Sequence, residues 1–165
     1  MHKKAQLVSI ELIVSIAVFM VLIVGVIIFW NIYSIRFNKD IDRNELAIKL
    51  VKISDTFVEN QGFPTAWNET NVQVIGLVNN DRTLNTNKLS SFKNVTYSGI
   101  KAILNIDAYD FYFRIIDLQG ATVSANGQII EIGSQPGANE ESVITIRRFL
   151  LYGSKKVIME FSIWK

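Results

Sequence analysis

An apolar run of 19 residues, Leu12 to Trp30, constrains this chain more than any other feature. At a rise of about 1.5 Å per residue it forms a helix about 29 Å long, close to the roughly 30 Å hydrocarbon thickness of a bilayer. It exceeds the roughly 7–15 apolar residues of a secretory signal peptide, and no small-x-small cleavage site follows it. We therefore expect a transmembrane segment over about residues 12–30 that an ordinary signal peptidase does not remove.

A carboxylate, Glu11, stands at the start of this run, and the basic pair Lys3-Lys4 precedes it. A charge at the centre of a membrane helix costs roughly 2.5–3.5 kcal/mol on insertion scales, and less near the interface. Two explanations fit this placement. Glu11 either snorkels to the headgroups as part of an ordinary anchor, or it pairs with a partner that processing or a neighbouring subunit supplies.

Composition excludes several classes of function. The net charge of +2 equals the contribution of Lys3 and Lys4, so no basic patch predicts a nucleic-acid partner. Cysteine is absent and the single histidine is His2. This excludes cysteine nucleophiles, histidine-based triads and the usual zinc sites beyond the N-terminus. We expect no enzyme activity, no catalytic residue, no cofactor and no metal.

The apolar pattern continues beyond the membrane segment at mostly helical spacing, with charges on the opposite face. Residues 26–61 contain no proline or glycine, and Gly62 and Pro64 follow in the positions expected after a helix. The pattern predicts one helix from about Val8 to about Asn60, with an amphipathic second half that packs on a domain. Residues 38–42 are its weakest point, and two helices separated by a break there are the alternative.

The remaining residues predict an α+β fold, in which the long helix packs on a small, mainly antiparallel β head with short helices. An irregular segment with large apolar anchors is expected over residues 62–67. Period-two alternation and turn residues place the other elements. We predict strands over 71–78, 110–117, 128–132, 142–152 and 156–164, helices over 85–92 and 96–104, and a loop over 133–139. The last two strands form a hairpin, and one face of the final strand is wholly apolar.

Two sequons, at Asn68 and Asn94, are candidate N-glycosylation sites on an exported head. For the second, Thr96 as a plain helix cap is the competing explanation. Three aspartates near Arg114 could be interpreted as a carboxylate site, but turn caps and a solvated strand face explain them better; they are Asp107, Asp110 and Asp117. The aromatic residues 111–113 are expected in the core and in subunit contacts.

The N-terminus resembles that of archaeal type IV pilin-like proteins with a class III signal peptide. The resemblance rests on residues 3–12, KKAQLVSIEL, followed by the apolar run and the long amphipathic helix. The family pattern is a basic pair, a small residue, then Gln-x-Ser-x-Glu. Here Ser9 and Glu11 stand three and five residues after Gln6, one more than is usual, and Ala5 replaces the more usual glycine. The head is similar more loosely, through residues 62–67, 109–114 and the last strand pair.

The resemblance implies a leader, residues 1–6, that a membrane prepilin peptidase removes on the cytoplasmic face. The processing residues would be Lys3, Lys4, Ala5, Gln6 and Leu7, with cleavage at Ala5–Gln6 or Gln6–Leu7. Residues 7–61 would be the long helix and residues 62–165 an extracellular head. Glu11, with Ser9, would act in assembly, where the new α-amine pairs with Glu11 and sets the register.

The implied function is a structural subunit of a type IV pilus-like surface filament. The precursor would lie in the cytoplasmic membrane with its head outside, and copies of the chain or related pilins would pack through the apolar helix. The implied partners are the prepilin peptidase, an assembly ATPase, a platform protein and the membrane. The alternative is a non-filamentous, single-pass, membrane-anchored extracellular binding or adhesion protein.

Overall fold

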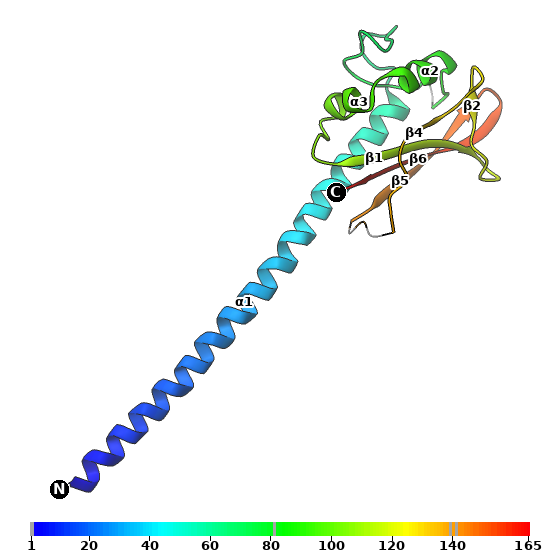
Figure 1. The fold of residues 1–165 in the computed structure, drawn as a ribbon. Helices are drawn as coiled ribbons and strands as arrows, with labels where there is room; N and C mark the ends of the chain where they lie inside the picture. Colours follow the sequence, from blue (N-terminus) through cyan, green and yellow to red (C-terminus); the bar gives the residue numbers. More distant parts are fainter. Residues whose placement is uncertain (1, 81, 139, 141) are drawn as a thin grey trace. The chain divides into compact units, whose positions relative to one another are not determined.

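The computed structural model describes residues 2–80, 82–138, 140 and 142–165, and it describes the side chains of these residues except 2–10, 36 and 38–42. The chain forms two compact units, Met1–Asn44 and Glu45–Lys165. Each unit is described by itself. Figure 1 labels the helices and strands.

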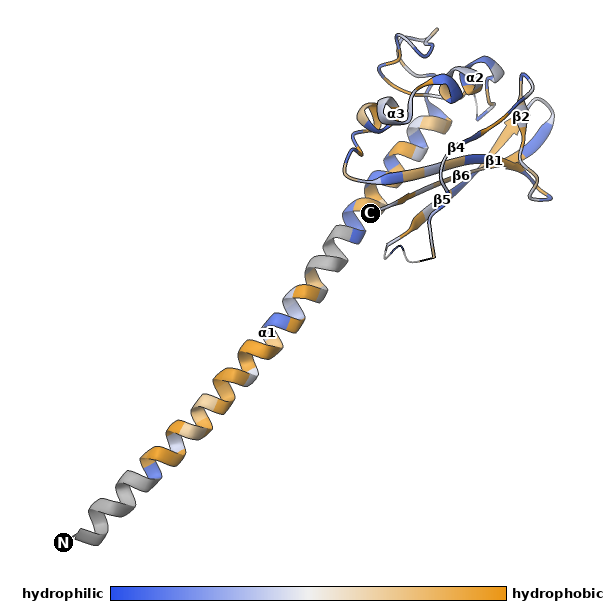
Figure 2. Cartoon of the chain, in the orientation of Figure 1, coloured by the Kyte–Doolittle hydropathy of each residue, from blue (hydrophilic) through white to orange (hydrophobic). Residues whose placement is uncertain are grey.

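The helix α1 runs from His2 to Glu59 without interruption. It therefore begins six residues before the predicted start at Val8, and the alternative of two helices with a break at residues 38–42 is wrong. The absence of proline and glycine between residues 26 and 61 explains this continuity, because these residues are the strongest helix breakers. The colours of Figure 2 show the change along α1 from a wholly apolar stretch to an alternation of apolar and polar residues.

The second unit begins inside α1, whose last four turns belong to the head. Leu46, Leu50, Ile53 and Phe57 recur at helical spacing and are buried in the core of this unit. Phe57 contacts three other aromatic rings, with centroid separations of 5.6 Å to Phe92, 5.9 Å to Phe113 and 5.4 Å to Phe161. The predicted amphipathic second half is confirmed.

A four-stranded antiparallel sheet of order β4-β1-β6-β5 forms the other layer of the head (Figure 1). Its strands are β1 (Asp110–Asp117), β4 (Glu131–Gly133), β5 (Ile144–Tyr152) and β6 (Lys155–Trp164). Two short strands, β2 (Ser124–Ala125) and β3 (Gln128–Ile129), pair separately. Together with the helices, this is the α+β layout that the sequence predicts.

The β5–β6 hairpin forms as predicted, with Tyr152 opposite Lys155 and Gly153 at φ +60° in the turn. The expected apolar face of β6 is buried in full: Val157, Met159, Phe161 and Ile163. The other face carries three buried residues as well, Glu160, Ser162 and Trp164.

Two short helices complete the head. Asn85 caps α2 (Thr86–Asn94) by accepting hydrogen bonds from the backbone N–H groups of Asn87 and Lys88. Thr96 caps α3 (Tyr97–Leu104) by accepting one from Gly99. Both helices lie where the sequence predicts them, and Thr96 is the N-cap that the sequence suggests.

The predicted strand over residues 71–78 is wrong. The segment forms two isolated β-bridges instead of a strand: Val74 pairs with Phe63, and Val78 pairs with Leu84. The segment is instead fixed by the C-terminal end of α1, where the N–H of Leu77 donates to the carbonyl of Phe57 at 3.0 Å. A helix end leaves such carbonyls without partners, and this segment supplies one of the missing donors.

Two smaller expectations also need correction. The predicted strand over 128–132 divides into β3 and β4, because Ile130 between them turns into the core and is fully buried. In the irregular segment 62–67, Trp67 is the buried anchor, and its Nε1 donates to the carbonyl of Gly76 at 3.0 Å. Phe63, the other expected anchor, is 57% exposed.

The substitution Phe57→Ala tests the core. It removes a fully buried ring, so we expect a loss of about 3–5 kcal/mol in the free energy of unfolding of the head. Urea unfolding of the full chain in detergent, followed by near-UV circular dichroism, measures this loss. Ile48→Ala is the matched control, because Ile48 lies on the same part of α1 but is 58% exposed. We expect the control to change stability by less than about 0.5 kcal/mol, and equal effects of the two substitutions would contradict the packing described.

Candidate assembly helix and head surface

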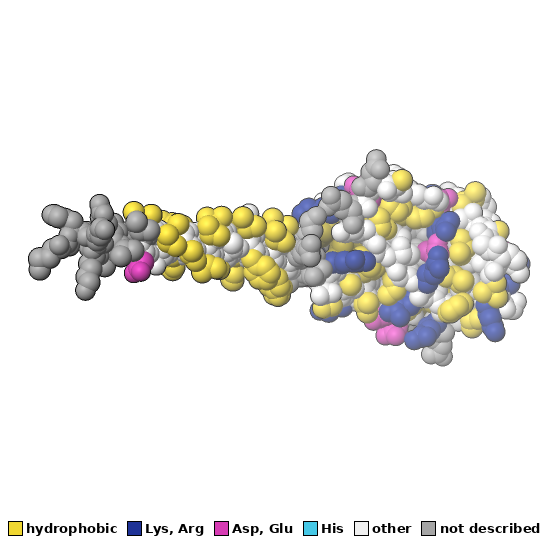
Figure 3. All heavy atoms as spheres, turned by 90° about the horizontal axis from the view of Figure 1, so that it is seen from below, with side chains coloured by type: hydrophobic (Ala, Val, Ile, Leu, Met, Phe, Trp, Pro, Cys, Tyr) yellow, Lys and Arg dark blue, Asp and Glu magenta, His cyan; other side chains and the backbone are white. Residues whose placement is uncertain are grey.

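The first candidate site is the apolar stretch of α1. Residues Glu11–Ile35 form a 25-residue span, its most apolar 18-residue window has a mean hydropathy of 3.3, and none of that window is buried. At about 1.5 Å per residue it is about 37 Å long, enough to cross a bilayer. Figure 3 shows hydrophobic side chains covering this stretch on the face in view. Its length and composition are those of a membrane anchor or a signal sequence.

Glu11 is exposed at the start of this span. The span contains no lysine, arginine or histidine, so a cationic partner must come from outside it. The predicted processing residues Lys3, Lys4, Ala5, Gln6 and Leu7, and Ser9 with them, have side chains that lie outside the described residues. The structure therefore places Glu11 and leaves the contacts of these six residues open.

Three stacked aromatic side chains lie at the C-terminal end of the apolar run and just beyond it. Phe29, Tyr33 and Phe37 recur every four residues, and adjacent rings stack with centroids 6.2 Å apart. Trp30 is exposed beside them. Aromatic side chains of this kind gather at membrane interfaces. The four-residue spacing of Phe29, Tyr33 and Phe37 is visible in the sequence.

The second candidate site is the outer face of the sheet, where a carboxylate pairs with two arginines. Arg114 Nε lies 2.5 Å from Glu160 Oε2, and Arg147 Nε lies 2.5 Å from Glu160 Oε1. The register places these residues side by side on β1, β6 and β5. Glu160 is buried, whereas the side chain of Arg147 is 68% exposed. Arg114 also stands opposite Glu131 of β4, so arginine and glutamate alternate across the four strands and their formal charges cancel. The one signal of this cluster in the sequence is the predicted hairpin, whose register pairs Arg147 with Glu160.

The charges of this cluster stabilise one another. Burial is the largest single influence and raises the pKa of Glu160, but hydrogen bonds from Arg114 and Arg147 outweigh it and hold the pKa below its usual value. The hydrogen bond to Glu160 raises the pKa of Arg114.

The aspartates near Arg114 do not form a site with it. Asp117 Oδ1 caps a turn by accepting from the N–H groups of Gln119 and Ala121, both at 2.9 Å. Asp110 Oδ1 accepts from Lys101 and from the hydroxyl of Tyr97, each at 3.1 Å, and the bond from Lys101 lowers the pKa of Asp110. Among the residues that the structure describes, no cluster of three or more His, Cys, Asp or Glu side chains could hold a metal ion.

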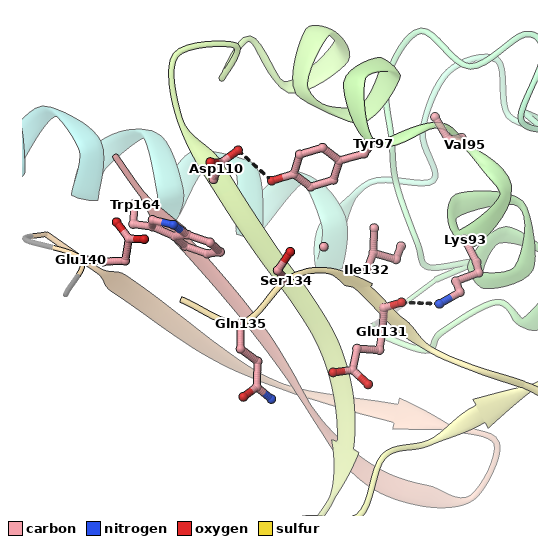
Figure 4. A pocket seen from close by; sticks show the side chains of 11 residues that line it. Lys93, Val95, Tyr97, Asp110, Glu131, Ile132, Ser134, Gln135, Glu140 and Trp164 are labelled. Carbon is pink, nitrogen blue, oxygen red and sulfur yellow. Dashed lines mark hydrogen bonds between the residues drawn. The ribbon is translucent and has the colours of Figure 1, made fainter. Parts of the chain in front are cut away.

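A polar cavity of about 640 Å³ lies beside these residues, between β4, the end of β6 and the start of α3 (Figure 4). Its aromatic and acidic groups are engaged with one another. Tyr97 stacks on Phe111 at 4.6 Å, its hydroxyl donates to Asp110, and Lys93 donates to the backbone carbonyl of Glu131. Burial raises the pKa of Tyr97, so its hydroxyl stays protonated as a donor. Through these contacts, Tyr97, Asp110 and Lys93 stabilise the walls of the cavity.

The two sequons lie in different surroundings. Asn68 is exposed, and its Oδ1 accepts a hydrogen bond from the hydroxyl of Thr70. Asn94 is the last residue of α2, and Thr96 is the N-cap of α3. Phe111 and Phe113 lie in the core as expected, whereas Tyr112 is buried on the other face of β1, where its hydroxyl donates to Glu131.

No protein-family model, no curated protein and no solved structure matches this chain. Its function is therefore inferred from its own residues and contacts.

The substitution Glu160→Gln tests the charge cluster on the outer face. It leaves Arg114 and Arg147 without their carboxylate, so we expect a loss of about 1–3 kcal/mol in the free energy of unfolding at pH 7. Urea unfolding measures the loss. Glu140→Gln, which changes an exposed carboxylate, is the control and should have little effect.

The same pair of variants predicts a pH dependence. Because the pKa of Glu160 is lowered in the folded state, its contribution is complete above the unfolded-state pKa of about 4.5 and is lost as pH falls through the lower folded-state value. The stability difference between wild type and Glu160→Gln should therefore shrink below pH of about 4.5. A difference that stays constant down to pH of about 2 would contradict the ion pairing.

Proposed function

We propose that this chain is the structural subunit of an archaeal type IV pilus-like surface filament. A prepilin peptidase processes it, and its apolar helix packs on copies of itself. The observation that carries the proposal is the exposed span Glu11–Ile35, in which a single carboxylate precedes 24 residues without a charge. An ordinary anchor needs the apolar residues only, whereas an assembling helix also needs a polar group that specifies register.

The physical basis is the environment of the span in each state. In the precursor, lipid covers the exposed apolar side chains. In a filament, neighbouring helices replace the lipid, and every charge that enters this core must be paired, because an unpaired buried charge is strongly destabilising. Glu11 is then tolerated only where a cation meets it. A new α-amine at Gln6 or Leu7 is such a cation, provided by the same chain or by its neighbour.

The head is consistent with the same proposal because residues 45–165 form a compact unit of their own. Its core is built from residues between Leu46 and Ile163, all of which belong to the second unit. Extraction of the helix from a membrane into a filament would leave this core intact. The outer sheet face, with the alternating arginines and glutamates around Glu160, offers a surface for head contacts.

The anchored-protein alternative draws on the same span, since its length alone is enough to hold a head at a membrane. The two functions differ in whether the N-terminus is processed. Mass spectrometry of the N-terminus in native cells distinguishes them. A start at Gln6 or Leu7 supports the filament subunit and selects the cleavage site. An intact start near Met1 leaves Lys3 and Lys4 in place and favours the anchor.

The substitution Glu11→Leu tests the assembly role directly. It removes the charge without reducing apolarity, so we expect normal membrane insertion and at least a tenfold lower yield of sheared surface filaments. Ser15→Leu, one turn further along the helix, is the matched control and should leave the yield within about twofold. Both variants are compared with wild type by membrane fractionation and by electron microscopy of the sheared fraction. A wild-type yield of filaments from Glu11→Leu would refute the register role.

A further inference from the structure

The first sequon forms an exposed turn that holds its asparagine in a defined orientation. Asn68, Glu69 and Thr70 are all exposed. Asn68 Oδ1 accepts two hydrogen bonds from Thr70, one from the backbone N–H at 3.0 Å and one from the hydroxyl at 2.7 Å. Side-chain oxygens of asparagine commonly stabilise turns in this way.

This turn prepares the amide for reaction. With Oδ1 held by Thr70, the Nδ2 of Asn68 is the group left for another molecule, and it makes no hydrogen bond within the part of the chain that the structure describes. Two donors on the carbonyl oxygen draw electron density from the amide, which makes the Nδ2 protons more acidic. The neutral amide nitrogen is a weak nucleophile, and these bonds do not strengthen it. They favour its alkylation only because a base can remove the more acidic Nδ2 proton more readily as the new bond forms.

The residues of the second sequon have structural roles in the head. Asn94 ends α2, Val95 is buried in the core, and the Thr96 hydroxyl oxygen accepts from the N–H of Gly99 at 3.2 Å as the cap of α3. Moving this tripeptide into the extended or turned conformation that a transferase binds would withdraw Val95 from the core and uncap α3. Motif alone does not separate the two sequons, but their surroundings do.

We propose that Asn68 carries an N-linked glycan on the folded, exported head and that Asn94 remains unmodified. In the reaction, Asn68 Nδ2 attacks the anomeric carbon of a glycan carried on a lipid-linked phosphate donor. The new carbon–nitrogen bond forms as the carbon–oxygen bond to the phosphate breaks. The phosphate leaves with the electron pair, and a base of the transferase takes one Nδ2 proton. The inference rests on the proposed function only in requiring that the head be exported.

A glycan at Asn68 also has a structural consequence for assembly. The turn that carries it continues to Val74, which pairs with Phe63. A bulky, hydrated group on this turn needs solvent around it. The surface formed by residues 63–74 would therefore face outward in any filament, and subunit contacts of the head would be made elsewhere.

The test is a peptide map of the full chain purified from native cells. Trypsin separates the sequons, because Asn68 falls in peptide 53–82 and Asn94 in peptide 94–101. We expect peptide 53–82 to carry the added mass of a glycan and peptide 94–101 to have its unmodified mass. Asn68→Gln and Thr70→Ala should abolish the added mass, whereas Thr70→Ser, which keeps the hydroxyl, and Asn94→Gln should retain it.

A further variant tests why Asn94 is spared. Val95→Ser keeps the second sequon but removes its anchor in the core, so a glycan should appear on peptide 94–101. Equal modification of both sites in the wild-type protein would refute the proposal that Asn68 is modified in preference to Asn94. An unmodified peptide 53–82 would refute the glycan at Asn68. Protease treatment of intact cells separates the causes: a head that is cleaved outside the cell but bears no glycan refutes this inference alone, whereas a protected head refutes the proposed export as well.

Discussion

The aromatic contact of Phe57 with Phe92, Phe113 and Phe161 is the interaction on which the rest of the head depends. It joins α1 to α2 and to the two central strands of the sheet at one fully buried point. Edge-to-face and tilted ring pairs at these separations stabilise the fold beyond the burial of apolar area, and they do so only in particular orientations. Phe92 also contacts Phe113 directly, with centroids 5.0 Å apart, so the end of α1, α2 and the sheet meet in one aromatic cluster.

The segment after α1 depends on the same point. The carbonyl of Phe57 accepts from Leu77, so the residue at the centre of the aromatic cluster also holds the chain that returns past the helix end. Gly76 permits this close approach, since a Cβ there would lie 2.1 Å from the carbonyl oxygen of Asn60. A side chain at this position is therefore excluded, and the segment packs as an irregular layer where its apolar alternation alone suggests a strand.

Sequence patterns predicted the elements whose side chains obey one period and failed where tertiary contacts decide. Residues 110–117 are rich in aromatic and β-branched residues and form β1 with the predicted bounds. Residues 71–78 are also rich in apolar and β-branched residues. Their backbone N–H groups, however, bond to separate places: Leu77 donates to Phe57 at the end of α1, and Gln73 and Val74 donate to Phe63. The division at Ile130 has the same origin, because one buried side chain turns the chain between two sheets. Glu11 was visible as an anomaly in sequence, whereas Glu160 looked like a routine polar residue until the register of three strands placed Arg114 and Arg147 beside it.

Glu160 and Glu11 differ in the cationic groups that lie near them in the chain. Glu160 has two guanidinium groups on neighbouring strands of its own chain. On a helix, the neighbours of Glu11 at three and four residues are Leu7, Val8, Val14 and Ser15, none of which carries a charge. Lys4 is seven residues away, about 10 Å along the axis. Cleavage at Gln6–Leu7 would create an α-amine four residues before Glu11, on the same face, whereas cleavage at Ala5–Gln6 would create one five residues away. Pairing within the chain therefore favours the Gln6–Leu7 site, and pairing between subunits is compatible with either.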